Sequence, residues 1–130
     1  MFSMIKRLSP KHSTSKTEIT LNRIAEIYQG LEEKKLQKGY WIVNIEVKDA
    51  EGYENYKKAS SEPLLRYGAK FLVRGGTQQT PEGSSKARTV VIEFPDLRAA
   101  QLCYQSPQYQ QAQAIRAKYS VADLVIVEGA

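Results

Sequence analysis

The chain has 130 residues, a length typical of one domain that buries a sizeable hydrophobic core. Its one cysteine, Cys103, excludes an internal disulfide, and no apolar run approaches the roughly 20 residues that cross a bilayer, so we expect a cytoplasmic protein with no membrane contact. The net charge of +5 comes mainly from residues 1–38, which contain eight Lys or Arg and four Asp or Glu. Residues 39–130 contain eleven Lys or Arg and ten Asp or Glu, so this part is nearly neutral, which argues against nucleic-acid binding.

Residues 1–16 are predicted to form a disordered basic tail. The basic residues of this segment are Lys6, Arg7, Lys11 and Lys16, and it contains no acidic residue. Such a composition is typical of a solvated chain end. Because serines accompany the basic residues, an alternative interpretation is import into an organelle through residues 1–16.

Residues 17–37 are predicted to form an appended amphipathic helix. Apolar side chains recur there at intervals of three, four and three residues, at Leu21, Ile24, Tyr28 and Leu31. The helix either lies on the surface of its own domain or binds a partner, which is another protein or a second copy of the chain.

Residues 38–130 are predicted to form one domain that begins with a strand at Tyr40–Lys48, in which apolar and polar side chains alternate only in part. Asp49 is suited to cap a following helix that ends at Gly68. Pro63 cannot donate a backbone hydrogen bond, so we expect a kink or break near residues 59–62.

The second half of the domain is predicted to contain a hairpin, two short helices and a last strand. Residues 69–74 and the apolar run that starts at Arg88 form two strands, joined by a loop rich in Gly, Thr and Ser. Asp96 is expected to cap the first of the two helices. Ser106 is expected to cap the second, with Pro107 at its first position. Residues 121–128 form the last strand, since they are almost entirely apolar.

The order of these elements is β-α-β-β-α-β, which is the ferredoxin-like arrangement of the α+β class. Its antiparallel sheet carries helices on one face only. Three of the predicted strands are apolar on both sides, so the other face would expose a large apolar surface. We therefore expect a homodimer in which a second copy covers that face.

Several motifs in this domain resemble a known family. They are Lys38-Gly39-Tyr40-Trp41-Ile42, the run Tyr67–Gly76, the run Ala87–Pro95, the run Cys103–Gln110 and the run Val125–Gly129. Together they resemble the small bacterial family called domain of unknown function 1330, over residues 38–130. The resemblance implies a ferredoxin-like protomer of a dimeric α/β barrel, and it implies no established activity.

The scarcity of histidine limits the chemistry of the domain. His12, the single histidine, lies in the predicted tail, so neither a Ser-His-Asp triad nor a histidine-ligated metal or haem is expected. We predict no cofactor and no metal site. Cys103 lies on the inner stripe of its predicted helix with no histidine to activate it, so it is expected to be a buried apolar residue.

Glu93 is the predicted catalytic candidate, because it is the one carboxylate in the apolar strand that follows Arg88. A buried carboxylate must be paired, hydrogen-bonded or neutralised. Arg74 or Arg88 is the expected partner. A closed pair would be structural, whereas a pair that opens into a cleft would make Glu93 a candidate general base.

A ligand site is predicted between the helices and the sheet. The candidate ligand-binding residues are Arg74, Arg88, Tyr40, Tyr104 and Arg116. Arginine is suited to an anionic group and the tyrosines to an apolar body. We therefore expect a small ligand that is partly apolar or anionic.

Two hypotheses for function follow. In the first, the protein is a homodimer that holds a small molecule, either as a binding protein or as a cofactor-free isomerase, decarboxylase or oxygenase; the catalytic version rests on analogy between folds. In the second, it is a non-catalytic interaction module that presents the N-terminal helix to another protein.

Overall fold

The computed structural model describes residues 15–130, except for the side chains of Ser15 and residues 30–36. Nearly all of the predicted basic tail, including His12, lies outside the described residues. The chain divides into one unit that ends at Leu36 and a second that comprises Gln37–Ala130.

The first unit contains helix α2, Ser15–Leu36. It begins two residues before the predicted start of residue 17. Among its described side chains the apolar ones are exposed, at Ile19, Leu21, Ile24, Ile27 and Tyr28. None of the described helices is both long enough and apolar enough to span a membrane.

The second unit follows the predicted order of strands and helices. The elements are β1 Gly39–Val47, α3 Ala50–Arg66, β2 Lys70–Arg74, β3 Arg88–Phe94, α4 Leu97–Gln105, α5 Pro107–Tyr119 and β4 Ser120–Glu128. The predicted caps are confirmed: the side chains of Asp49, Asp96 and Ser106 accept hydrogen bonds from backbone amides at the starts of α3, α4 and α5.

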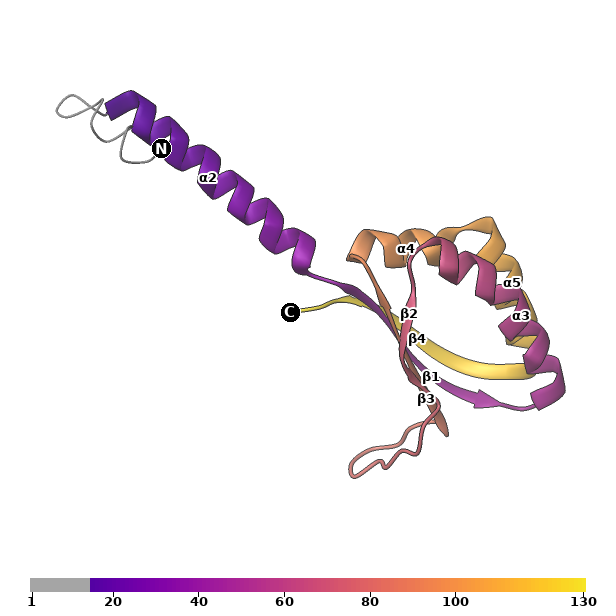
Figure 1. Cartoon of the computed structure of the whole chain (residues 1–130). Helices are drawn as coiled ribbons and strands as arrows, with labels where there is room; N and C mark the ends of the chain where they lie inside the picture. The colour runs from indigo at the N-terminus through magenta and orange to yellow at the C-terminus, as the bar shows by residue number, and fades with distance from the viewer. Residues whose placement is uncertain (1–14) are drawn as a thin grey trace. The chain divides into compact units, whose positions relative to one another are not determined.

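These strands form one antiparallel sheet in the order β2-β3-β1-β4, so β3 and β1 are its central strands. Helices α3, α4 and α5 cover one face of this sheet, and no helix of the Gln37–Ala130 unit covers the other (Figure 1). The fold is therefore α+β and ferredoxin-like, as predicted. We call the two surfaces of the sheet the helix face and the open face.

The core lies on the helix face and is built around the alternation of β1. Trp41, Val43 and Ile45 of this strand are buried there, as expected for every second residue of a strand. The indole Nε1 of Trp41 donates to the backbone oxygen of Ala100 in α4 at 2.9 Å. The Trp41 ring also packs against Tyr109 of α5, with ring centroids 4.7 Å apart.

Strand β2 contains a β-bulge between Phe71 and Val73. Phe71 pairs with Ile92 and Arg74 pairs with Val90, both of which are buried residues of the helix face. Two residues three positions apart normally point to opposite faces of a strand. The extra residue, Leu72, shifts this alternation, and Phe71 and Arg74 therefore lie on the same face.

A kink or a break was predicted near residues 59–62, and the break is wrong. Helix α3 runs without interruption from Ala50 to Arg66, with Pro63 inside it. Pro63 lies in the last turn, where a missing amide interrupts the helix least because few residues follow it. The carbonyl of Pro63 still accepts a hydrogen bond from the Tyr67 amide at 3.2 Å, which closes the helix.

The open face exposes a large apolar surface, as predicted from the sequence. Ile42 lies at its centre, opposite Val91 of β3 and Val125 of β4. Val125 has 57% of its surface exposed, and Val127 and Val73 are exposed as well. Within the Gln37–Ala130 unit this apolar surface has no covering element.

A loop of residues 75–87 joins β2 to β3 and is held at its end by Asn44 of β1. The Asn44 amide oxygen accepts from the Lys86 amide at 2.6 Å, and its nitrogen donates to the Arg88 carbonyl at 3.2 Å. Lys86 also forms an ion pair with Asp123 of β4. These contacts fix the chain at the point where Arg88 begins β3.

Replacing Gly39 with alanine is expected to destabilise the domain. A Cβ atom at this position would lie 2.6 Å from the Cα atom of Leu97 and closer still to the carbonyl of Asp96, so the start of α4 would have to move. We expect a loss of about 1–3 kcal/mol in the free energy of unfolding, measured by denaturant titration. Gly76→Ala is the matched control, because a Cβ atom there meets nothing within 4 Å; equal losses in both variants would contradict this packing.

Candidate functional site

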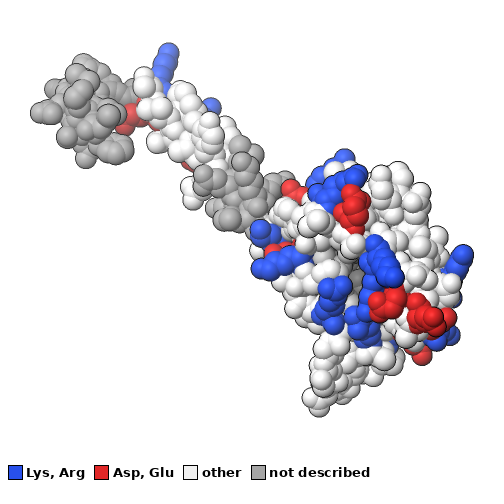
Figure 2. Space-filling view, turned by 45° about the vertical axis from the view of Figure 1, so that its right-hand side comes forward, with Lys and Arg blue, Asp and Glu red and all other residues white. Residues whose placement is uncertain are grey.

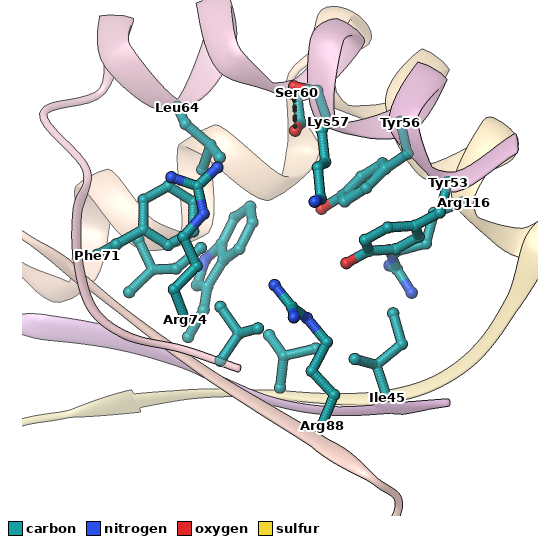
Figure 3. A pocket seen from close by; sticks show the side chains of 14 residues that line it. Ile45, Tyr53, Tyr56, Lys57, Ser60, Leu64, Phe71, Arg74, Arg88 and Arg116 are labelled. Atoms are coloured by element: carbon teal, nitrogen blue, oxygen red, sulfur yellow. Dashed lines mark hydrogen bonds between the residues drawn. The ribbon is translucent and has the colours of Figure 1, made fainter. Parts of the chain in front are cut away.

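A cavity of about 40 Å³ lies on the helix face, between α3 and the sheet. Residues of α3, α5 and strands β1, β2 and β3 surround it (Figure 3). The lining residues are Trp41, Val43, Ile45, Tyr53, Tyr56, Lys57, Ser60, Leu64, Phe71, Arg74, Arg88, Val90, Ile92 and Arg116. The lining is thus aromatic and aliphatic, with a small number of cationic groups.

Helix α3 supplies one wall of the cavity. Tyr53, Tyr56, Lys57, Ser60 and Leu64 all line it, and their spacing of three and four residues places them on one side of the helix. Asp49 fixes the start of this helix through hydrogen bonds from the amides of residues 51 and 52. Tyrosine and lysine side chains therefore enter the cavity from a fixed position.

Strands β2 and β3 supply two arginines from the opposite wall. The Arg74 guanidinium stacks on the Phe71 ring, with 4.1 Å between its Cζ atom and the ring centroid. The Arg88 guanidinium lies against Gly75, where a Cβ atom would come within 3.1 Å of Arg88 Nε and nearer still to Nη1. Gly75 has a φ of +72° and leaves room for this side chain. Both arginines line the cavity: in Figure 3, Arg88 points from the sheet towards Tyr53 and Tyr56. Arg74 lies beside Phe71, near Leu64.

Arg116 supplies the deepest cationic group. It belongs to α5 and is only 6% exposed, and its Cζ atom lies 5.5 Å from the centroid of the Tyr56 ring. The Nε atoms of Arg116 and Arg88 are buried and have no hydrogen-bond partner. Buried polar atoms normally have partners, and buried charges normally have a counter-charge.

Tyr56 and Tyr109 meet beside Arg116, with their hydroxyl oxygens 2.7 Å apart. Burial raises the pKa of Tyr56, and the neighbouring Tyr109 and Arg116 oppose this only in part. Burial likewise raises the pKa of Tyr109, with a further contribution from Tyr56. Both hydroxyls therefore stay protonated at neutral pH and both have a hydrogen to donate.

The charges of the cavity are unbalanced. Lys57, Arg74, Arg88 and Arg116 line it, and no Asp or Glu of residues 15–130 does. The ion pairs in this part of the chain are Lys57–Glu54, at 3.0 Å, together with two that involve no lining residue, so the three arginines are unpaired. Figure 2 shows Lys and Arg side chains spread over the visible face of the Gln37–Ala130 unit, with fewer acidic side chains among them.

Two wider clefts share residues with the cavity. One, of about 460 Å³, includes Ile45, Val47, Tyr53 and Arg88 in its lining. The other, of about 200 Å³, lies along α3 and includes Arg74. A ligand with one end in the inner cavity thus has open space for the remainder of the molecule.

The structure brings three of the five predicted ligand-binding residues together. Arg74, Arg88 and Arg116 line the cavity. Tyr40 lies in the alternate register of β1, on the open face. Tyr104 of α4 packs edge to face against Trp41, with ring centroids 5.8 Å apart, and is not among the lining residues.

Glu93 also lies on the open face, directly opposite Tyr40 in the sheet. Its carboxylate accepts a hydrogen bond from the Tyr40 hydroxyl at 3.1 Å, and its neighbour on β2 is Lys70. The expectation that Arg74 or Arg88 pairs with Glu93 is wrong, because both arginines lie on the helix face. The catalytic role of Glu93 stays a prediction, and the protomer does not bring Glu93 and Arg74 into one site.

Several lining residues were not predicted from the sequence as ligand contacts, notably Trp41, Tyr56, Lys57 and Ser60. The signal for Lys57 was its place in the inner stripe of α3, where a charged residue is unusual. Arg116 is likewise a charged residue in the buried stripe of its helix, since Tyr109, Ala112 and Arg116 of α5 are buried and recur at intervals of three and four residues.

Cys103 is buried in α4, and its Sγ atom lies 3.7 Å from the carbonyl oxygen of Pro63. Among the described residues, no group of three or more His, Cys, Asp or Glu is placed to hold a metal ion. Burial raises the pKa of the Cys103 thiol to about 12. Because the thiolate is the reactive form, this cysteine is not an activated nucleophile.

We expect Cys103 in the native protein to react with an aromatic disulfide reagent at pH 8 at least roughly a hundredfold more slowly than in the denatured chain. The raised pKa also means that the folded state holds the thiol proton more tightly than the unfolded state. This contribution to stability is complete below the pKa of the unfolded thiol and is lost as the pH rises towards 12. Equal reaction rates in native and denatured protein would show that the thiol is accessible.

Comparisons with known proteins agree with this fold. A family model described as "Domain of unknown function (DUF1330)" matches residues 38–130. No protein of curated function matches the sequence. Three solved structures are similar to the chain, and at their levels of identity the likeness concerns the fold alone.

The first of these is the RPA0582 protein of unknown function from Rhodopseudomonas palustris, with 16% identity, a TM-score of 0.58 and coverage of 88% of this chain and 93% of that one. The second is SnoaB, a cofactor-independent oxygenase from Streptomyces nogalater, with 13% identity and a TM-score of 0.51; the match covers 70% of this chain and 91% of SnoaB. The third is a dimeric protein of unknown function with a ferredoxin-like fold from Bacteroides fragilis, with 16% identity, a TM-score of 0.47 and coverage of 70% and 95%.

Proposed function

The chain belongs to the family described as domain of unknown function DUF1330, and we propose that it binds a small, partly apolar organic anion in the cavity between α3 and the sheet. The observation that carries this proposal is Arg116, a guanidinium that is 6% exposed, has a partnerless Nε atom and has no acidic residue beside it in the cavity lining. The groups that offset the burial of this charge are the neutral hydroxyls of Tyr109 and Tyr56, and a bound anion would supply a full counter-charge.

The other lining residues support the same proposal. Arg74 and Arg88 come from different strands, and their guanidinium groups share the cavity with Arg116. Tyr53, Phe71 and Trp41 add aromatic surface, which suits an apolar body. A mostly apolar cavity with a few convergent polar groups is the usual form of a small-molecule site.

A catalytic version of this function is a cofactor-free isomerase, decarboxylase or oxygenase reaction on the bound anion. The likeness to SnoaB supports it only at the level of the fold, because identity is 13%. The cavity itself offers cationic groups that would stabilise negative charge developing on a substrate.

Small carboxylates are expected to bind the wild-type protein and to raise its thermal unfolding temperature in a dose-dependent manner. Arg116→Met should weaken benzoate binding roughly tenfold or more, because it removes a charged hydrogen-bond donor. The unliganded variant should remain folded, since a buried unpaired charge is replaced by an apolar side chain of similar length. Emission from Trp41, the one tryptophan, reports binding because its ring lines the cavity.

Arg98→Met is the matched control, since Arg98 is an exposed residue of α4 that does not line the cavity. Chloride at the same ionic strength is the reference for general salt effects. The proposal fails if neither acetate, benzoate nor inorganic phosphate changes the unfolding temperature or the Trp41 emission of the wild-type protein relative to the values measured in chloride.

The open face supports a homodimer. Ile42, Val91, Val125 and Val73 form a contiguous apolar surface across all strands of the sheet. A second copy would remove this surface from water, and an identical patch on each copy suits a two-fold axis. We place the two ligand cavities on the other side of each sheet, so each is built within one protomer.

A second candidate function is a protein-interaction module that uses α2. The observation in its favour is the exposure of Leu21, Ile24 and Tyr28, which follow one another at three and four residues. This spacing is typical of the apolar positions of a coiled coil, and the three residues together span little more than one heptad. In this alternative the helix binds another protein and the cavity has no part in recognition.

Static light scattering at micromolar concentration should give about twice the chain mass of 14.7 kDa. Val125→Lys and Ile42→Lys should each shift the mass towards that of the monomer, because a charge would be buried between the two open faces. Ile24→Lys in α2 and Leu65→Lys on the exposed side of α3 should leave the dimer intact. A dimer that is lost only in the Ile24→Lys variant would assign self-association to α2 and contradict the role of the open face.

A further inference from the structure

Burial favours one of the two possible directions of the hydrogen bond between Tyr56 and Tyr109. Tyr109 is 0% exposed and does not line the cavity, whereas Tyr56 does. Each hydroxyl has one hydrogen, and the bond between them uses only one of the two. If Tyr56 were the donor, the hydrogen of Tyr109 would be left in the interior without an acceptor among the described residues. The hydrogen bond therefore runs from Tyr109 to Tyr56, and the hydrogen of Tyr56 stays available at the cavity wall.

Arg116 adds further donors to the same wall. Its guanidinium lies over the Tyr56 ring, and a guanidinium has N–H groups but no acceptor. With Tyr56 it forms a surface that donates hydrogen bonds and offers few acceptors in return. The complementary ligand group is one that only accepts hydrogen bonds, as an ionised oxyanion does.

The size and the lining of the inner cavity favour one class of oxyanion. The cavity is small, about 40 Å³, and its lining is mostly apolar. A carboxylate has one carbon and two oxygens and carries a single negative charge, so it suits this space. A phosphate group is larger and carries more charge at neutral pH, so its transfer into this lining would cost more.

We propose that the inner cavity holds the carboxylate head group of an organic acid, with Tyr56 as its neutral hydrogen-bond donor and Arg116 as its cationic donor. The rest of the ligand extends into the cleft of about 460 Å³, whose lining includes Ile45, Val47 and Tyr53 together with the carboxylates of Glu46 and Glu54. Tyr109 is a positioning residue that directs the Tyr56 hydrogen towards the ligand. The inference rests on the proposed anion-binding function and adds to it the ligand class and a specificity-determining residue.

Tyr56→Phe tests this assignment, because it removes the donor and keeps the ring that packs against Arg116. In titrations of the full chain followed by Trp41 emission, we expect its affinity for benzoate to fall roughly tenfold or more. Tyr67→Phe is the matched control, since Tyr67 caps the same helix and does not line the cavity; its affinity should stay within about twofold of wild type. Unfolding temperatures without ligand show whether each variant is folded.

The Tyr109→Phe variant shows whether Tyr56 contacts the ligand directly or only helps to hold the cavity wall in place together with Tyr109. It leaves the Tyr56 hydroxyl in place, so we expect a smaller loss of benzoate affinity than in Tyr56→Phe. Equal losses in the two variants would show that the pair supports the wall instead of donating to the ligand, and would overturn the role of Tyr56. Unchanged benzoate affinity in a folded Tyr56→Phe variant would overturn it as well.

Inorganic phosphate distinguishes the ligand classes. Tighter binding of phosphate than of acetate and benzoate would overturn the carboxylate assignment while leaving anion binding in place. A wild-type protein that responds to none of the three contradicts the proposed function itself. Preference for the carboxylates, together with its loss in Tyr56→Phe, is the result that supports this inference.

Discussion

The candidate site depends on cationic side chains that share an interior space without a carboxylate. Arg116 is buried almost completely, and Arg74 and Arg88 reach the same space from two strands. Stability alone does not explain this arrangement, since apolar residues of similar volume would fill the space at no electrostatic cost. The fold tolerates the charges because Phe71, Tyr56 and Gly75 hold the guanidinium groups through stacking and close contact.

The alternation of β1 divides the molecule into two functional surfaces. Trp41, Val43 and Ile45 point to the helix face and form the core and the floor of the cavity. Tyr40 and Ile42 point to the open face, which has no helix in the Gln37–Ala130 unit. The proposed ligand site and the proposed assembly surface thus lie back to back, separated by one sheet. Substitutions on one surface are therefore expected to leave the other largely intact.

The fold was predictable from local signals, and the site only in part. Asp49, Asp96 and Ser106 mark the starts of the helices, and apolar runs mark the strands, because capping and burial act over a few residues. The face of each residue was harder to predict. Glu93 and Arg74 were expected to be neighbours, yet strand alternation puts Glu93 on the open face. The face of the sheet on which Arg74 lies depends on the β-bulge in β2. This bulge arises from the pairing with β3 and cannot be predicted from the sequence of β2 alone.

That irregularity, the bulge at Leu72, links the two surfaces of the sheet. In a regular strand, Phe71 and Arg74 would project in opposite directions, and the guanidinium would emerge among the valines of the open face. The extra residue therefore keeps a positive charge away from the apolar open face and places it, still exposed, among the residues that line the cavity of the helix face. A β2 strand that kept all five residues but paired regularly would instead turn Arg74 to the open face, where two copies of the chain would bring like charges together. The proposed ligand contact and the proposed assembly surface therefore both depend on this irregular pairing.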